Sequence, residues 1–229
     1  MRRTSGDGGQ TGVWKLGLVL ALIAGSRSSA VAQMPGAPVL QNVWATPGAV
    51  GAFNFGGGSD GEVYAAAASW APASSRFALS GGFGARRITS IGSRSVYGVR
   101  LAIPFGGGPT SAVGFAAFVG VGGSTTGKAA VPDSAQSTSE VPLGAAIGWR
   151  KALGSTHGIS VYASPSYVLL SGGSKKSGLV RGAVGADVGI TPALGLTLGV
   201  EFGQTRGRAV GGPSGTSYGV GLAYAFGRR

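Results

Sequence analysis

The chain has 229 residues, of which 46 are glycine, none is cysteine, 43% are hydrophobic and 11% are charged, with a formal net charge of +12. This much glycine disfavours a helical protein, because each glycine inside a helix costs about 1 kcal/mol relative to alanine, and the lack of an every-third-residue repeat excludes collagen. The apolar content disfavours a disordered chain, and the missing cysteines exclude a disulfide framework or a thiolate metal site.

The first 32 residues have the three parts of a secretory signal peptide. Arg2 and Arg3 lie in a basic start, residues 16–25 form an apolar run, and Ala30-Val31-Ala32 fits the small-x-small cleavage pattern. Ten apolar residues are too few to cross a bilayer, which takes about 20. We therefore predict a cleaved signal-peptide helix at 1–32, export by the general secretion route, a short periplasmic segment at 33–46 and one domain at 47–229.

The rest of the chain divides into about ten segments with alternating apolar residues, separated by Gly, Pro and Ser clusters. A period of two indicates β-strands, and no later run has the roughly 18 apolar residues of a membrane-spanning helix. Ten-residue stretches suit tilted strands that cross a bilayer. The predicted strands are 48–56, 62–71, 76–87, 95–106, 111–122, 140–151, 158–170, 178–190, 193–205 and 215–227.

The last segment shows the alternation most clearly. From Tyr218 to Phe226 every second residue is bulky and apolar, and the residues between them are Gly or Ala. Aromatic residues at both ends of an apolar band are typical of a strand that crosses a bilayer, because their rings favour the boundary between water and lipid. The residues predicted to form such an aromatic girdle are Trp70, Tyr97, Phe105, Trp149, Phe202, Tyr218, Tyr224 and Phe226.

The second face of each strand decides between a membrane barrel and a soluble, lipocalin-like binding barrel. Gly, Ala and Ser dominate this bare face, with an occasional charge. If it faced water, the molecule would have an almost uncharged surface and would aggregate. The pattern therefore favours an all-β, closed antiparallel up-and-down transmembrane barrel of about ten strands, with eight as the alternative, whose small residues point inward.

The connections alternate in length. Short ones are predicted at 71–75, 107–110, 152–157 and 191–192, and longer, polar ones at 88–94, 123–139, 171–177 and 206–214. Membrane barrels have short periplasmic turns and longer external loops. An even number of strands then leaves both ends of the barrel in the periplasm.

Six charged residues fall on the bare face, where charge avoids the lipid. Asp187 and Glu201 lie on neighbouring strands and are expected to pair with Arg181 or Arg100. The group would either form a constriction for anionic solutes or an ion-pair network that closes the lumen. Because aqueous channels belong to barrels of about 16 or more strands, closure is the preferred interpretation. The predicted lumen charges are Arg86, Arg100, Arg150, Arg181, Asp187 and Glu201.

The predicted external loops carry basic residues that suit the phosphates of lipopolysaccharide, since Arg and Lys bind phosphate oxygens strongly. Solvated loop charge is the simpler alternative. Arg94 and Lys128 lie in these loops. The residues predicted to face lipopolysaccharide are Lys175, Lys176, Arg206 and Arg208.

The sequence contains no convincing catalytic, cofactor or metal site. His157, the single histidine, is predicted in a periplasmic turn, and Asp133 and Glu140 are predicted in the long loop without a histidine partner. The stretch 122–128 fits the phosphate-loop pattern G-x-x-x-x-G-K, but Ala129 replaces the Ser or Thr that holds magnesium. We expect neither catalysis nor a cofactor, and export argues against nucleic acid as a partner.

The signal peptide, the alternating strands, the connection lengths and the aromatic strand Tyr218–Phe226 together resemble the small outer-membrane β-barrel proteins of Gram-negative-type bacteria. The resemblance covers residues 45–229 and identifies no subfamily. It implies a monomer in the outer membrane whose last strand is recognised by the barrel-assembly machinery, although Gly227-Arg228-Arg229 follow the final aromatic residue. The expected role is structural or in surface interaction, and the alternative is a narrow pore for small or hydrophobic solutes.

Overall fold

The computed structural model describes residues 42–44, 46–58, 61–74, 76–88, 92–107, 111–126, 137–154, 157–172, 175–205 and 215–226. The predicted signal peptide and most of the predicted periplasmic segment lie outside these ranges. Within them, no helix is long and apolar enough to span a membrane. The strands are β1 (Gly48–Gly58), β2 (Glu62–Ala71), β3 (Ala78–Ile88), β4 (Gly92–Gly106), β5 (Val113–Thr126), β6 (Thr138–Ala152), β7 (Gly158–Gly172), β8 (Lys175–Gly189), β9 (Leu194–Thr205) and β10 (Gly215–Ala225).

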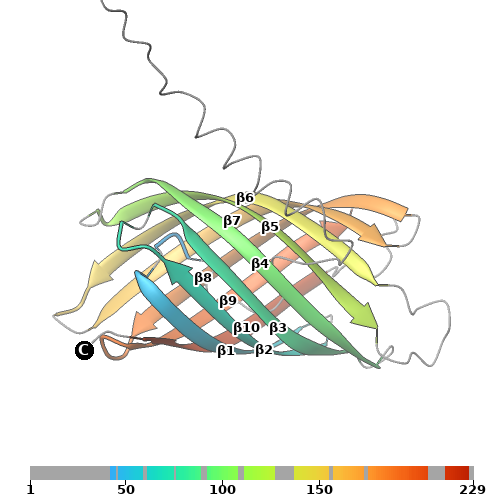
Figure 1. Ribbon diagram of the computed structural model, residues 1–229, viewed down its shortest axis with the longest axis horizontal. Coiled ribbons are helices and arrows are strands. Elements are labelled where there is room, and N and C mark those ends of the chain that lie inside the picture. The colour runs from blue at the N-terminus through green and yellow to red at the C-terminus, as the bar shows by residue number, and fades with distance from the viewer. Residues whose placement is uncertain are drawn as a thin grey trace, which may run out of the picture.

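Each strand pairs antiparallel with the next, and β10 pairs with β1 to close the barrel (Figure 1). At the closure Phe53 pairs with Leu222 and Phe55 with Val220. A closed barrel leaves no strand edge unpaired, which a lipid environment requires because it offers backbone groups no other hydrogen-bond partners. The predicted all-β, ten-stranded up-and-down barrel is confirmed, and the eight-stranded alternative is wrong.

The bulky apolar residues point outward. Phe83 is 70% exposed, and Leu198, Val220 and Leu222, near the middle of their strands, are also exposed. Their neighbours in sequence, such as Thr197 and Gly221, face the lumen and are buried. Because the Leu and Val rows do not meet in a central core, the lipocalin-like alternative does not fit this arrangement.

The eight residues predicted for the aromatic girdle lie toward the two ends of the outer surface, whereas Phe53 and Phe83 are exposed near the middle of β1 and β3. Trp70, Phe105, Trp149, Tyr224 and Phe226 lie near the end that carries the first residues of β1 and the last residues of β10, which we call the short-turn end. At the opposite end, the long-loop end, Phe202 and Tyr218 are exposed and Tyr97 is half-buried. All eight residues predicted for the girdle therefore lie on the outer surface.

Two of the predicted long connections are wrong. The connection between β3 and β4 is residues 89–91 and that between β7 and β8 is residues 173–174, because the paired strands continue beyond the predicted apolar segments. The register runs through Ile88↔Gly92 and Gly172↔Lys175. The connections 127–137 and 206–214 remain long. Strand pairing thus extends past the apolar band, into residues whose polar character resembles that of a loop.

Candidate functional site: the barrel lumen

The lumen is filled by side chains from all sides of the barrel. Asn54 of β1, Val63 of β2, Val168 of β7 and Leu179 of β8 all point inward and are almost completely buried. Side chains lining a water-filled channel would be accessible to water. From Asn54 near the middle to Val63, Val168 and Leu179 toward the long-loop end, this lumen therefore resembles a protein interior more than a pore.

Arg181 of β8 is the centre of a buried ion cluster. Its Nη1 donates to Oε2 of Glu140 on β6 at 2.9 Å, and its Nε lies 3.5 Å from Oε1 of Glu201 on β9. The predicted pairing of Glu201 with Arg181 is confirmed. Glu140 was predicted both as the first residue of the strand at 140–151 and as part of the long loop, and the structure confirms the strand. Glu140 lies on β6, where the pairing of Glu140 with Leu170 continues the sheet. One arginine thus bridges carboxylates from two other strands.

A second inward group surrounds Arg100 of β4. Its guanidinium carbon lies 3.9 Å from the ring centroid of Phe118 on β5, and both side chains are buried. Tyr162 of β7 also points inward and is buried. The inward glycines make room for these rings: a Cβ on Gly144 would overlap Phe118, and one on Gly185 would lie 2.5 Å from the Tyr162 hydroxyl.

The segment before β1 enters the lumen at the short-turn end. Val43 is 3% exposed and packs with Ala116 and Ala146, and Trp44 packs against this group. The guanidinium carbon of Arg150 lies 4.8 Å from the Trp44 ring centroid, and Arg150 Nε donates to the Ser111 carbonyl at 3.2 Å. The predicted separate periplasmic segment therefore includes residues that belong to the barrel interior.

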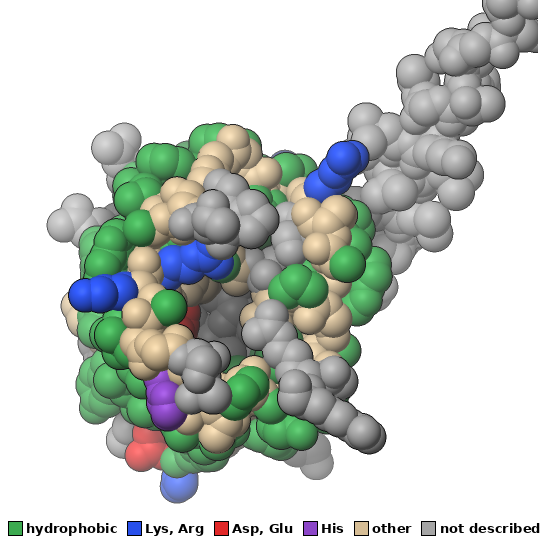
Figure 2. Space-filling model, turned by 90° about the vertical axis from the view of Figure 1, so that its left-hand side faces the viewer, with side chains coloured by type: hydrophobic (Ala, Val, Ile, Leu, Met, Phe, Trp, Pro, Cys, Tyr) green, Lys and Arg blue, Asp and Glu red, His purple; other side chains and the backbone are tan. Residues whose placement is uncertain are grey.

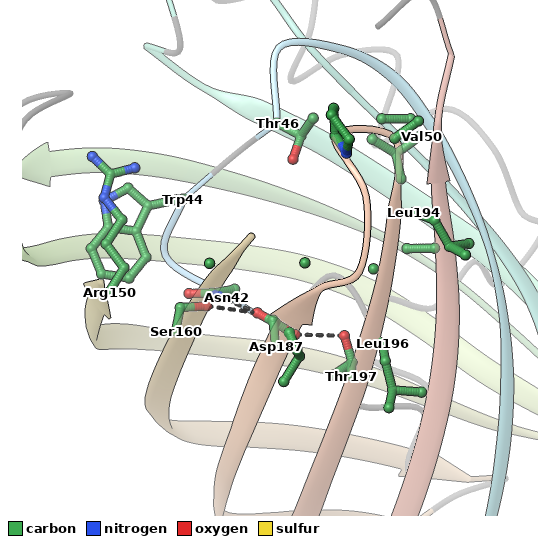
Figure 3. A pocket seen from close by; sticks show the side chains of 18 of the residues that line it. Asn42, Trp44, Thr46, Val50, Arg150, Ser160, Asp187, Leu194, Leu196 and Thr197 are labelled. Carbon is green, nitrogen blue, oxygen red and sulfur yellow. Dashed lines mark hydrogen bonds between the residues drawn. The ribbon is translucent and has the colours of Figure 1, made fainter. Parts of the chain in front are cut away.

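Asp187 anchors this segment to the wall. Asn42 Nδ2 donates to the Asp187 carboxylate and, at 2.7 Å, to Ser160 Oγ (Figure 3). Ser160 Oγ at 3.2 Å and Thr197 Oγ1 at 2.5 Å also donate to Asp187. The prediction that Asp187 pairs with an arginine is wrong: within the described part of the chain three neutral donors, from Asn42, Ser160 and Thr197, hydrogen-bond to its carboxylate instead. Hydrogen bonds to a carboxylate stabilise its charge away from water.

A cavity of about 510 Å³ remains beside the segment, facing the other half of the barrel. Figure 2 shows the short-turn end hollowed, with charged side chains inside the opening and the histidine at its rim. The lining of the cavity includes Trp44, Arg150, His157 and Asp187. Small apolar residues and hydroxyls from the opposite wall complete it, namely Val50, Ser69, Ser80, Ala102, Pro104 and Ala223.

The remaining predicted charged residues lie in the lumen, at the two ends of the barrel or outside the described part of the chain. Arg86 is buried on the inward face, as predicted, and directly opposite it lies Arg94, also buried. Arg94 was predicted in an external loop, which is wrong because β4 already begins at Gly92. Lys176 is exposed at the long-loop end and His157 is exposed at the short-turn end. The side chain of Lys175 and the residues Lys128, Asp133, Arg206 and Arg208 lie outside the described part of the structure.

Within the described ranges, no three His, Asp or Glu side chains gather as a metal site would require. The inward arginines Arg86, Arg94, Arg100, Arg150 and Arg181 outnumber the inward acids Glu140, Asp187 and Glu201 among the residues that the structure describes. The chemistry that this lumen offers is therefore positive charge and hydrogen-bond donors, held in place by packed aromatic rings.

Sequence reasoning missed the roles of Asn42, Trp44, Phe118 and Tyr162. The signal for Phe118 and Tyr162 was present, since both alternate with outward residues on predicted strands and must point inward. Asn42 and Trp44 precede the first strand and follow no periodic pattern, so only their contacts with Gly114, Gly148 and Asp187 reveal their place.

No family model matches the sequence, and no curated protein matches it. Among solved structures, the barrel is similar to the beta domain of the Bordetella autotransporter Brka, with 14% identity and a TM-score of 0.52 over 79% of this chain and 100% of that chain. Neisserial surface protein A (NspA) aligns with 13% identity and a TM-score of 0.38 over 78% of this chain and 94% of that chain, a similarity too low to support an argument. The chain has the fold of the bacterial outer-membrane β-barrels, as its sequence resemblance predicts, and its subfamily stays unidentified.

Proposed function

We propose that this protein is an outer-membrane β-barrel with a closed lumen and a structural or surface-interaction role, without catalytic chemistry. The observation that carries the proposal is the combination of an apolar outer surface with a lumen whose central side chains are buried. An outer surface bearing Phe83, Leu198 and Leu222 suits lipid, and a filled lumen suits an anchor better than a channel.

The proposed orientation places the short-turn end in the periplasm, since short periplasmic turns and longer external loops are typical of such barrels. The signal peptide predicted at 1–32 would direct the chain to the general secretion route. The barrel-assembly machinery would then recognise β10, whose outward residues include Tyr218 and Tyr224 and which is followed directly by the exposed Phe226. We further propose that the barrel is a monomer in lipid.

Lipopolysaccharide is the lipid partner that we propose for the long-loop end. Lys176 is exposed there, and Arg206 and Arg208 lie in the sequence between β9 and β10, whose connection is at the same end. Cationic side chains at this rim would bind the phosphates of the outer leaflet.

The competing function is a narrow pore, and conductance separates the two. The purified mature chain, refolded and inserted in planar bilayers, is expected to give no stable channels of solute-passing size. If the unmodified protein forms stable channels that pass solutes, the proposal of a closed barrel is wrong and the protein is a pore. A folded state must be verified in the same sample, for example by an electrophoretic shift on heating, so that silence is not mistaken for failed insertion.

A further inference from the structure

The wall of the lumen at the short-turn end contains a site shaped for an aromatic side chain. Gly114 of β5 and Gly148 of β6 face Trp44, and a Cβ on them would lie 3.0 Å and 2.7 Å from its indole ring. Ordinary side chains at these two positions would occupy the space of the ring. Arg150 covers the indole at 4.8 Å, so the site provides both a cavity for the ring and a cation beside it.

The same wall also binds the side chain of Asn42, two positions before Trp44. Asn42 Nδ2 donates to Ser160 Oγ at 2.7 Å and to the Asp187 carboxylate. Val43, between the two, is buried against Ala116 and Ala146. Three consecutive side chains thus each have a dedicated contact on strands β5 to β8, which is more than a chain passing over a surface would need.

We propose that this wall is a peptide-recognition site for an Asn-x-Trp segment, filled by the chain's own residues Asn42, Val43 and Trp44. The occupant docks reversibly. Trp44 Nε1 is buried and has no hydrogen-bond acceptor among the described residues, and a buried unsatisfied donor weakens the docked state. Arg150 and Asp187 already line the cavity beside the docked segment, and departure of the segment would remove the Trp44 ring from Arg150 and the Asn42 amide from the Asp187 carboxylate.

This inference goes beyond the proposed function and can fail separately from it. The Arg181 cluster and the contact of Arg100 with Phe118 do not involve the segment. A barrel whose segment never docks would still be closed in its middle, and a conducting barrel would still contain the wall site.

Thiol protection tests docking in the full mature chain. Because the chain lacks cysteine, Val43→Cys introduces one thiol, which a water-soluble maleimide should label slowly. Asn42→Ala should raise the labelling rate by about tenfold or more, since it removes hydrogen bonds to a charged acceptor. Gly114→Val should also raise it, because the three atoms nearest to a Cβ there belong to Trp44 and Val43.

Gly195→Val is the matched control for this experiment. Gly195 lines the same cavity, but the nearest atom to its Cβ position is the Val188 carbonyl oxygen at 3.6 Å, an ordinary contact. Labelling should stay slow in this variant. Fast labelling of Val43→Cys in the otherwise unmodified chain, or equal rates in all variants, would overturn docking.

A peptide added in trans tests recognition. The pentapeptide Asn-Val-Trp-Ala-Thr, with a fluorophore at its C-terminus, should bind the folded full-length Asn42→Ala/Trp44→Ala variant, whose own segment has lost its two anchors. It should bind the unmodified chain at least tenfold more weakly, because the cis segment already fills the site, and Gly114→Val should abolish binding to the double variant. Absence of binding to the folded double variant, or equal binding to the unmodified chain, would overturn the inference.

Discussion

The Nη1 of Arg181 lies 2.9 Å from Oε2 of Glu140, although β8 and β6 are not neighbours in the sheet. The side chain of Arg181 therefore crosses in front of β7, inside the barrel, to reach its partner. Both side chains are buried, and Glu201 on β9 also contacts Arg181. A single guanidinium thus joins three strands, β6, β8 and β9, and the first prediction tests its contribution to stability.

Arg181→Met should lower the free energy of unfolding by about 3–5 kcal/mol, because it leaves two buried carboxylates without their cation. Urea titration of the protein folded in lipid vesicles measures the loss. Arg76→Met, a substitution of the same type at an exposed position in the turn after β2, should cost almost nothing. Equal losses in both variants would contradict the assigned role, and Glu140→Gln with Glu201→Gln should recover part of the Arg181→Met loss.

Phe118→Ala combined with Arg100→Ala should let ions through a barrel that is otherwise silent. The guanidinium carbon of Arg100 on β4 lies 3.9 Å from the ring centroid of Phe118 on β5, and both side chains point into the lumen. The matched control is Phe115→Ala together with Arg100→Ala, since Phe115 lies on the same strand but faces outward. Single-channel recording should separate the two variants, and identical traces would show that Phe118 does not help to close the lumen.

Val220→Arg should destabilise the barrel by about 2–4 kcal/mol, whereas Tyr224→Arg should cost about 0–1 kcal/mol. Both residues are outward and exposed on β10, but Val220 lies near the middle of the strand and Tyr224 near its end. Folding into vesicles at a series of denaturant concentrations gives both values. A cost independent of position would mean that this surface does not face a bilayer.

Gly84→Ala should destabilise the barrel by about 1–3 kcal/mol through overpacking. A Cβ at Gly84 would overlap the Tyr64 carbonyl oxygen and lie 2.7 Å from the Ala65 Cβ, and neither the backbone nor a Cβ can turn away. Gly195→Ala, with its nearest atom at 3.6 Å, serves as the control and should be nearly neutral. Thermal unfolding in detergent provides the comparison, and a neutral Gly84→Ala would disprove the close approach of β2 to β3.

Charge reversal of Lys176, Arg206 and Arg208 to glutamate should reduce the lipopolysaccharide that co-purifies with the barrel, because it replaces phosphate-binding cations by repelling charges. Reversal of Arg76 and Lys151, exposed near the short-turn end, should leave co-purification unchanged. Phosphate analysis of the purified samples quantifies bound lipid. If neither the triple reversal nor the control reversal changes the amount of bound lipopolysaccharide, the proposed lipid site is wrong.

The sequence predicts the strands and their inward and outward faces well, because an apolar period of two is dictated by strand geometry. It fails for Arg94 and leaves Glu140 at the boundary between strand and loop, since strand pairing continues beyond the apolar band while the residues there look like a polar loop. It predicts a lumen closed by ion pairs, but it misses the aromatic rings that also fill the lumen. Inward glycines such as Gly144 and Gly185 do not reveal from the sequence which rings occupy the space beside them, and in the structure these rings are Phe118 and Tyr162.

The candidate site depends on relations that one strand cannot reveal. Arg181 is recognisable as an inward residue of β8, but its partner Glu140 comes from 41 positions earlier in the chain. Asn42 reaches Asp187 over 145 positions. Alternation gives the direction of each side chain but not its height along the barrel axis, and the height decides which charges meet.

The pairing of β1 with β10 has a consequence for how the molecule forms. Until the final strand arrives, the sheet has two open edges, whose amide and carbonyl groups would attract other chains or remain unsatisfied in hydrocarbon. Closure joins the most distant parts of the barrel sequence, which is the slowest kind of contact for a polypeptide to make. A cell that exports this chain must therefore hold it unassembled until synthesis and transport of the whole barrel are finished.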